Sequence, residues 1–135
     1  MKPYLQATWI SLAALFVVAA LAVTLVFQVL AFFSSGCGND VLSEVVSPDG
    51  TRKAVIFRRD CGATTAYSTQ ISILPAHESL PNQTGNVFVS DFVTVNATWK
   101  SANALVISYP AGARVHRAAK TFHDIAVTYA TIPGG

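Results

Sequence analysis

The chain has 135 residues, with 9 basic and 7 acidic side chains and a formal net charge of +2 at pH 7. Such a near-neutral balance excludes a strongly electrostatic nucleic-acid binder, which carries a pronounced basic face. The charges are also unevenly placed, because Lys2 is the only charged residue before position 34. The sequence therefore predicts a cytoplasmic stub with a transmembrane helix at 1–33, followed by one domain at 34–135 that is too short for a large catalytic α/β fold.

The stretch 7–33 contains no charged side chain. As a helix it would be about 40 Å long at about 1.5 Å per residue, which exceeds the hydrocarbon thickness of about 30 Å. We therefore expect an uncleaved, single-pass transmembrane helix in contact with the lipid bilayer. The alternative is a cleaved secretory signal, whose apolar core is usually about 7–15 residues long and ends at small residues, such as those at 34–36.

The charges on either side of the span predict its orientation. Lys2 precedes it, and the first charge after it is Asp40. Because positive charge favours the cytoplasmic side, we expect the N-terminus in the cytoplasm and residues 34–135 outside it.

Three small or polar residues in the span, Ala20, Thr24 and Gln28, are four residues apart and share one helix face. Small residues let transmembrane helices approach closely, and an amide can donate a hydrogen bond across the interface. The stripe therefore predicts packing against another transmembrane helix in a membrane complex. The alternative is that Gln28, near the outer end, extends its amide to water.

Residues 34–135 show period-two alternation instead of a helical period, which predicts strands. The clearest case is 93–100, where Val95 and Ala97 alternate with Thr94 and Asn96. The other expected strands are 41–46, 52–58, 69–74, 86–89, 104–109, 113–117 and 122–130. Turns rich in proline and glycine separate them. Together they predict a small all-β antiparallel domain, built as a meander, a sandwich or an open barrel.

The expected core consists of the apolar side chains that these strands would bury. Its members are Val55, Phe57, Ile71, Ile73, Val87, Val89, Val95, Trp99, Leu105, Ile107, Ile125, Val127 and Tyr129. Two segments, 47–57 and 99–107, each have the strand-turn-strand pattern of a hairpin.

The chain has two cysteines, Cys37 and Cys61, and both follow the predicted span. Outside the cytosol, two cysteines usually pair, so we expect one disulfide. Two alternatives stay open. One is a lipid attached to Cys37, because Ser35-Gly36-Cys37 resembles the last three positions of a bacterial lipoprotein signal, although Ser34 takes the place of the leucine in that pattern. The other is a pair of free thiols.

The histidines His77, His116 and His123 have no recognised metal-ligand spacing. His116 and His123 would approach each other if they lay on neighbouring strands, with Asp124 as a further ligand. Surface positions are the simpler interpretation, and we predict no metal, no cofactor and no catalytic residue.

One basic cluster, formed by Arg114, His116, Arg117 and Lys120, contains no acidic residue. It could bind anionic lipid headgroups or an acidic partner. The alternative is a charged edge strand that discourages pairing with other chains.

The chain resembles a family of small exported, membrane-attached bacterial proteins of unassigned function. The residues that carry this resemblance are Ser47-Pro48-Asp49-Gly50, the run 59–65 (RDCGATT), Ser68-Thr69-Gln70 and Asn86-Val87-Phe88-Val89. The resemblance implies an extracytoplasmic, membrane-attached protein, and it implies no catalytic residue. Together with the predicted span and its orientation, we expect a bacterial inner-membrane protein with a periplasmic domain.

Two functions follow from these expectations. The first is a membrane-anchored, non-catalytic interaction module or accessory subunit of a membrane protein complex. The second is a small periplasmic hydrolytic or metal-dependent enzyme. The first is preferred because each distinctive feature has a structural use.

Overall fold

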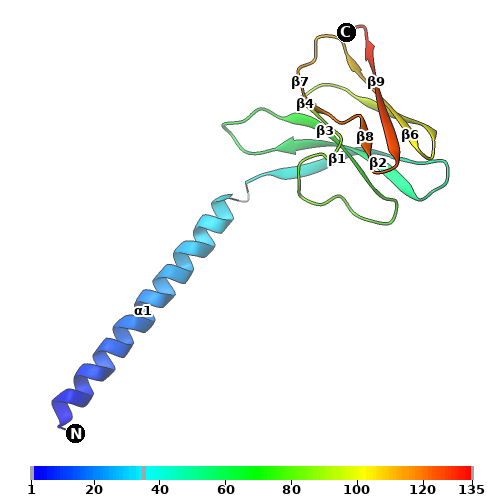
Figure 1. The fold of residues 1–135 in the computed structure, drawn as a ribbon. Coiled ribbons are helices and arrows are strands. Elements are labelled where there is room, and N and C mark those ends of the chain that lie inside the picture. The colour runs from blue at the N-terminus through cyan, green and yellow to red at the C-terminus, as the bar shows by residue number, and fades with distance from the viewer. Residues whose placement is uncertain (1, 35, 135) are drawn as a thin grey trace. The chain divides into compact units, whose positions relative to one another are not determined.

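The computed structural model describes residues 2–34 and 36–134, with backbone only at 32–34. The chain divides into two compact units, Met1–Gly36 and Cys37–Gly135, which Figure 1 shows as one helix and one β domain. The boundary lies slightly after the expected one between 33 and 34, and the expected fold class is confirmed. Ser35, part of both the small-residue cleavage site and the lipid-attachment pattern, lies outside the described residues.

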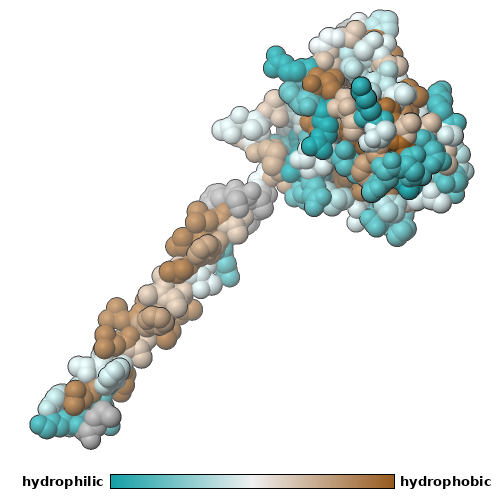
Figure 2. Space-filling model, viewed as in Figure 1, coloured by the Kyte–Doolittle hydropathy of each residue, from teal (hydrophilic) through white to brown (hydrophobic). Residues whose placement is uncertain are grey.

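The helix α1 (Pro3–Ser34) begins with a proline, whose fixed φ suits the first helical turn. The hydroxyls of Thr8, Ser11 and Thr24 donate to backbone carbonyls three or four residues earlier, at 2.8–2.9 Å, and are thereby satisfied within the helix. Its segment Pro3–Ala31 is long and apolar enough to cross a membrane, and its side chains are exposed. Figure 2 shows hydrophobic side chains along most of its length.

The β domain contains nine strands within the described range. They are β1 (Gly38–Val46), β2 (Arg52–Asp60), β3 (Ser68–Pro75), β4 (Phe88–Asp91), β5 (Asn96–Ser101), β6 (Ala104–Pro110), β7 (Val115–Ala118), β8 (Thr121–Phe122) and β9 (Ile125–Ile132). One sheet has the strand order β1-β2-β3-β4-β7, and the other has the order β5-β6-β9-β8. The two sheets pack face to face around one core, so the domain is a sandwich.

One strand pairing departs from a purely antiparallel meander, because β6 and β9 run parallel, from Ala104↔Ala126 to Pro110↔Ile132. After β6 the chain crosses to the five-stranded sheet as β7, pairs with β4, and then returns. Parallel neighbours need such a crossover. Alternation along a strand shows which face is buried but not which strand is its neighbour, so the sequence pattern could not predict this pair.

The expected strand 122–130 is interrupted by a tight turn. His123 has φ +52°, in the left-handed region that histidine tolerates better than most residues. The neighbouring Asp124 accepts a hydrogen bond from Asn103 Nδ2 at 2.7 Å and forms a salt bridge with Arg52 at 2.8 Å. These contacts fix the turn that separates β8 from β9.

The turn between β1 and β2 forms where the Ser47-Pro48-Asp49-Gly50 signal predicts it. Ser47 Oγ donates to Asp49 Oδ1 at 2.6 Å, and the Thr51 hydroxyl donates to Asp49 Oδ2 at 2.9 Å. The hydrogen bond from Ser47, followed by those from Thr51, lowers the pKa of Asp49 below its usual value. Gly50 supplies the positive φ of +72° that closes the turn.

The main core lies between the sheets and contains most of the expected residues. Its buried members are Ala54, Ile56, Ile71, Ile73, Val87, Phe88, Val95, Ala97, Leu105, Ile107, Ile125 and Val127. Trp99 and Tyr129 pack against it half-buried. The indole of Trp99 also links the sheets, because its Nε1 donates to the Val45 carbonyl at 2.9 Å.

Three expected core residues lie outside the main core, although two of them are buried in a second cluster, as core residues should be. Val55 and Phe57 are buried, but on the opposite face of β2, in a second cluster with Leu74 and Leu80. The run Ala54-Val55-Ile56-Phe57 is apolar on both faces, so alternation cannot assign its sides. Val89 is half-buried and Phe88 is fully buried, because β4 turns Phe88 toward Ile71 in the main core.

Tyr129 joins the two sheets at their aromatic centre. Its hydroxyl donates to the Ala119 carbonyl at 2.7 Å and lies 3.3 Å from the Val87 carbonyl. Its ring lies 5.9 Å from that of Phe88, centroid to centroid. Burial raises the pKa of Tyr129 to about 12, with a smaller contribution from Tyr109.

This raised pKa predicts a loss of stability in alkali. Below the unfolded value of 10.0, both states hold the phenol proton and the stabilisation is fully present. As the pH rises from there toward about 12, only the folded state keeps the proton, so the free energy of unfolding falls. We expect urea titrations of the full-length protein in detergent to show a steeper fall over this interval for the wild type than for Tyr129→Phe. Parallel curves would contradict this role of Tyr129.

Candidate functional site

The disulfide predicted from cysteine number and compartment is present, joining Cys37 to Cys61. Cys37 directly precedes β1 and Cys61 directly follows β2, and the neighbouring residues Gly38 and Asp60 form the last pair of that ladder. The bond therefore closes the end of the first hairpin at the point where the chain enters the domain. We call this end of the five-stranded sheet the entry end.

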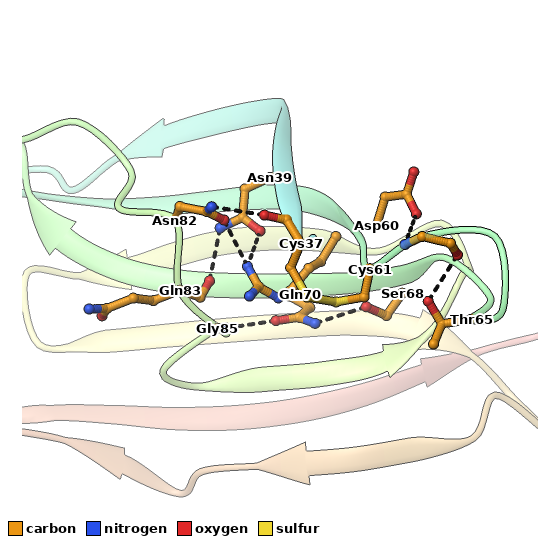
Figure 3. The surroundings of a disulfide bond; sticks show 12 residues. Cys37, Asn39, Asp60, Cys61, Thr65, Ser68, Gln70, Asn82, Gln83 and Gly85 are labelled. Atoms are coloured by element: carbon orange, nitrogen blue, oxygen red, sulfur yellow. Dashed lines mark hydrogen bonds between the residues drawn. A yellow bond between two sulfur atoms is a disulfide. The ribbon is translucent and has the colours of Figure 1, made fainter. Parts of the chain in front are cut away.

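A polar network holds the segment 76–87 against the outer face of the same sheet (Figure 3). Asn82 Nδ2 donates to the Cys37 carbonyl at 2.8 Å, and Asn39 Nδ2 donates to the carbonyls of Pro81 and Gln83 at 3.0 and 2.8 Å. The Arg59 guanidinium donates to Asn39 Oδ1 at 2.6 Å and to Asn82 Oδ1 at 3.1 Å. The entry end is thus fixed by hydrogen bonds as well as by the disulfide.

The backbone of the segment 76–87 lies very close to the five-stranded sheet at Gly85. The Gly85 amide donates to Gln70 Oε1 at 2.7 Å. A Cβ at this position would lie 2.8 Å from the carbonyl oxygens of Ile71 and Phe88, so only glycine fits. Leu80 of the same segment covers the second apolar cluster.

An open cleft of about 720 Å³ lies at the entry end. Its lining residues are Asp60, Gly62, Ala63, Thr65, Ala66, Tyr67, Asp91, Phe92 and Arg114. The sheet register brings these segments together, because Ser68 at the start of β3 pairs with Asp91 at the end of β4, and the Asp91 amide donates to the Arg114 carbonyl at 3.0 Å.

The loop between β2 and β3 forms one wall of this cleft. Asp60 Oδ1 accepts a hydrogen bond from the Gly62 amide at 2.9 Å, and Gly62 has φ +104°. The Thr65 hydroxyl and amide both donate to the Gly62 carbonyl, at 3.2 and 3.1 Å. The disulfide at Cys61 and these local bonds hold the loop that carries Tyr67.

Two exposed aromatic rings form the apolar part of the cleft. Tyr67 and Phe92 are 46% and 54% exposed, and their ring centroids lie 6.0 Å apart in an edge-to-face arrangement. The Arg58 guanidinium stacks 4.8 Å from the centroid of Tyr67 and forms a 2.6 Å ion pair with Asp40. The hydrogen bond to Asp40 raises the pKa of Arg58 above its usual value, and a guanidinium is already charged at physiological pH without that shift.

The basic cluster lies on β7 and the residues around it, and β7 is an edge strand of the five-stranded sheet. The expectation of a charged edge strand is therefore confirmed. The cluster is not free of acidic contacts, because His116 Nε2 lies 2.8 Å from Asp91 Oδ1. Arg114 lines the cleft, and its side chain forms no ion pair or hydrogen bond among the described residues. Binding of an anionic partner by this cluster stays a prediction.

The histidines do not come together. His116 is on β7, which pairs with β4, whereas His123 is in the turn between β8 and β9 of the other sheet. The two histidines are therefore not on neighbouring strands. Within residues 2–34 and 36–134, no three His, Cys, Asp or Glu side chains form a group that could hold a metal ion. The side-chain partner of His116 is Asp91. Within the described residues, no hydroxyl or thiol is hydrogen-bonded to His116, so the arrangement of a nucleophile with its general base is not formed there.

The stripe of Ala20, Thr24 and Gln28 is exposed along α1. The Thr24 hydroxyl donates to the Ala20 carbonyl at 2.8 Å. The Gln28 amide has no partner among the described residues, so it is the polar group of the stripe with unused hydrogen-bonding capacity. Packing of this face against another helix stays a prediction.

Sequence reasoning did not identify Tyr67, Phe92, Arg58 or Asp91 as members of one site. Tyr67 follows a run of small residues in a loop, and Phe92 follows the last residue of β4, so neither position belongs to an alternating pattern. The available signal was an aromatic residue in each of two loops, and only the sheet register shows that the two loops are adjacent.

Comparisons of the chain with protein-family models, with curated proteins and with solved structures find no match. The resemblance to small exported bacterial proteins therefore stays a prediction from the residues.

Proposed function

We propose that the protein is a membrane-anchored, non-catalytic interaction module that serves as an accessory subunit of a membrane protein complex. In this proposal α1 is an uncleaved anchor in the bacterial inner membrane. The N-terminus lies in the cytoplasm and the β domain lies in the periplasm.

The anchor and its orientation are supported by three features of the chain. The apolar segment Pro3–Ala31 is long enough to span the bilayer. Lys2 precedes it, and positive charge favours the cytoplasmic side. The Cys37–Cys61 disulfide lies on the other side of the span, as an oxidising compartment would allow.

The observation that carries the accessory-subunit proposal is the amide of Gln28, which has no partner among the described residues and is the one amide side chain in the segment 7–31. An amide inside the bilayer is costly unless it is hydrogen-bonded. The small side chain at Ala20 and the internally bonded Thr24 leave room beside Gln28 for the backbone of another helix. A second helix packed on this face would hydrogen-bond to the Gln28 amide and would fill the space beside the small side chains.

The test is in-membrane crosslinking of the full-length protein in native membranes. A photoreactive benzophenone side chain replaces Phe27, which lies beside the stripe at the helical period. Gln28→Leu keeps the helix apolar and should weaken association with other transmembrane proteins by about 0.6–2 kcal/mol, and Ala20→Phe should weaken it by steric exclusion. Membrane insertion of both variants should be unchanged.

Gln6→Leu is the control for the loss of an amide elsewhere on the helix, because Gln6 lies near the other end of α1, 22 residues before Gln28. Its adducts should equal those of the wild type. If Gln28→Leu and Ala20→Phe both leave every adduct unaltered, α1 is a simple anchor whose amide reaches water, and the accessory-subunit proposal fails.

A further inference from the structure

We propose that the entry-end cleft docks on the phospholipid headgroup layer of the protein's own membrane. The rings of Tyr67 and Phe92 would enter the interface, and the guanidinium of Arg114 would bind lipid phosphate. This inference rests on the membrane-anchor part of the proposed function, but not on the accessory-subunit part.

Chain connectivity limits how far this end of the domain can lie from the membrane exit. Only two residues separate Ser34, the last residue of α1, from Cys37, and three steps of extended chain span at most about 11 Å. The disulfide joins Cys61, which begins the loop that carries Tyr67, to the same point. The bilayer surface is therefore the partner that the covalent structure keeps within reach of the cleft.

The chemistry of the exposed rings fits a bilayer interface. Tyrosine and other aromatic side chains concentrate where an apolar body can enter lipid and a polar tip can stay in water. Tyr67 and Phe92 come from different loops and meet edge to face, so they form one paired apolar surface. The disulfide and the Asp60–Gly62 bond order this surface before binding, which reduces the entropy lost on docking.

Of the charged side chains around the two rings, Arg114 is the one that has a guanidinium without a side-chain partner among the described residues. Asp91 is paired with His116, and Asp60 accepts from the Gly62 amide. Arg58 is paired with Asp40. Arg114 lines the same cleft without a side-chain partner among the described residues, and a guanidinium matches phosphate oxygens in a two-pronged geometry.

The experiment places a benzophenone side chain at Phe92 in the full-length protein. The purified protein is reconstituted in nanodiscs of phosphatidylcholine alone, or of phosphatidylcholine with phosphatidylglycerol, and irradiated. The control carries the same side chain at the exposed His77, which follows Pro75, the partner of Arg52 at the opposite end of the sheet. We expect phospholipid adducts at position 92 and none at position 77. Equal yields at both positions, or no lipid adduct at position 92, overturn the inference.

The role of Arg114 is tested by Arg114→Gln in the benzophenone variant. A basic side chain near an anionic surface contributes about 1 kcal/mol, so the preference for discs that contain phosphatidylglycerol should fall about fivefold. Lys100→Gln is the matched control, because Lys100 is an exposed cation next to Trp99, which bonds to Val45 near the other end of β1. An equal fall in both variants would overturn the assignment of Arg114 as the phosphate ligand.

Irradiation in native membranes separates this inference from the accessory-subunit proposal. Lipid adducts at position 92 support the inference whatever the Gln28→Leu experiment shows. Protein adducts there instead of lipid overturn the inference and leave the accessory-subunit proposal standing.

Discussion

Replacing Phe88 with alanine is expected to lower the free energy of unfolding by about 3–5 kcal/mol, the range for a large aromatic side chain removed from a core. Phe88 is 0% exposed, and its ring lies 5.4 Å from Tyr109 and 5.9 Å from Tyr129. The cavity would therefore open inside the aromatic cluster that joins the two sheets. Urea unfolding of the full-length protein in detergent, followed by tryptophan fluorescence, measures the change.

The adjacent variant Val89→Ala is the matched control for this prediction. Val89 is half-buried and belongs to the outer face of β4, so we expect a loss of about 1 kcal/mol or less for its truncation. A larger loss of stability for Val89→Ala than for Phe88→Ala would show that β4 directs Val89, and not Phe88, into the main core. It would overturn the register of this part of the sheet.

Removal of the disulfide should have an effect of similar size. The bond joins cysteines 24 residues apart, and closing a loop of about 25 residues stabilises a protein by about 3.5 kcal/mol in the chain-entropy model. We expect Cys37→Ser with Cys61→Ser to lower the free energy of unfolding by about this amount. The same urea titration measures it, and reduced wild-type protein should unfold at the same midpoint as the double variant.

Two controls make the disulfide prediction specific. A reducing agent should leave the double serine variant unchanged, since within the described residues it has no other disulfide. Limited proteolysis should cut the variant first in the loop 61–67, because Cys61 then no longer holds that loop to the start of β1. Equal stability of the wild type and the double variant would show that the polar network of Asn39, Arg59 and Asn82 fixes the entry end without the covalent bond.

The parts of the fold that could be predicted from the sequence are those governed by local pattern. The uncharged run predicted α1, the alternation at 93–100 predicted β5, and the Ser47-Pro48-Asp49-Gly50 signal predicted the first turn. The cysteine pair was predicted from number and compartment, without any geometry. Each of these inferences depends on residues close in sequence or on the chemistry of one side-chain type.

The parts that could not be predicted depend on contacts between distant segments. The parallel pairing of β6 with β9 depends on a crossover through the other sheet. Val55 and Phe57 are buried on the outer face of β2 because Leu80, from a distant segment, covers them there. The cleft requires the loop with Tyr67 to lie beside Phe92, and that proximity follows from the register Ser68↔Asp91. A single alternating stretch contains none of this information.

In the proposed function, α1 is a retained anchor and the β domain lies outside the cytoplasm. The most direct test of this topology is protease treatment of intact spheroplasts that express the full chain with a different epitope tag at each end, followed by detection of both tags. We expect the C-terminal tag to be lost and the N-terminal tag to stay on a short membrane-bound fragment. A protected C-terminal tag, or a β domain released without α1 before any protease is added, would contradict this topology.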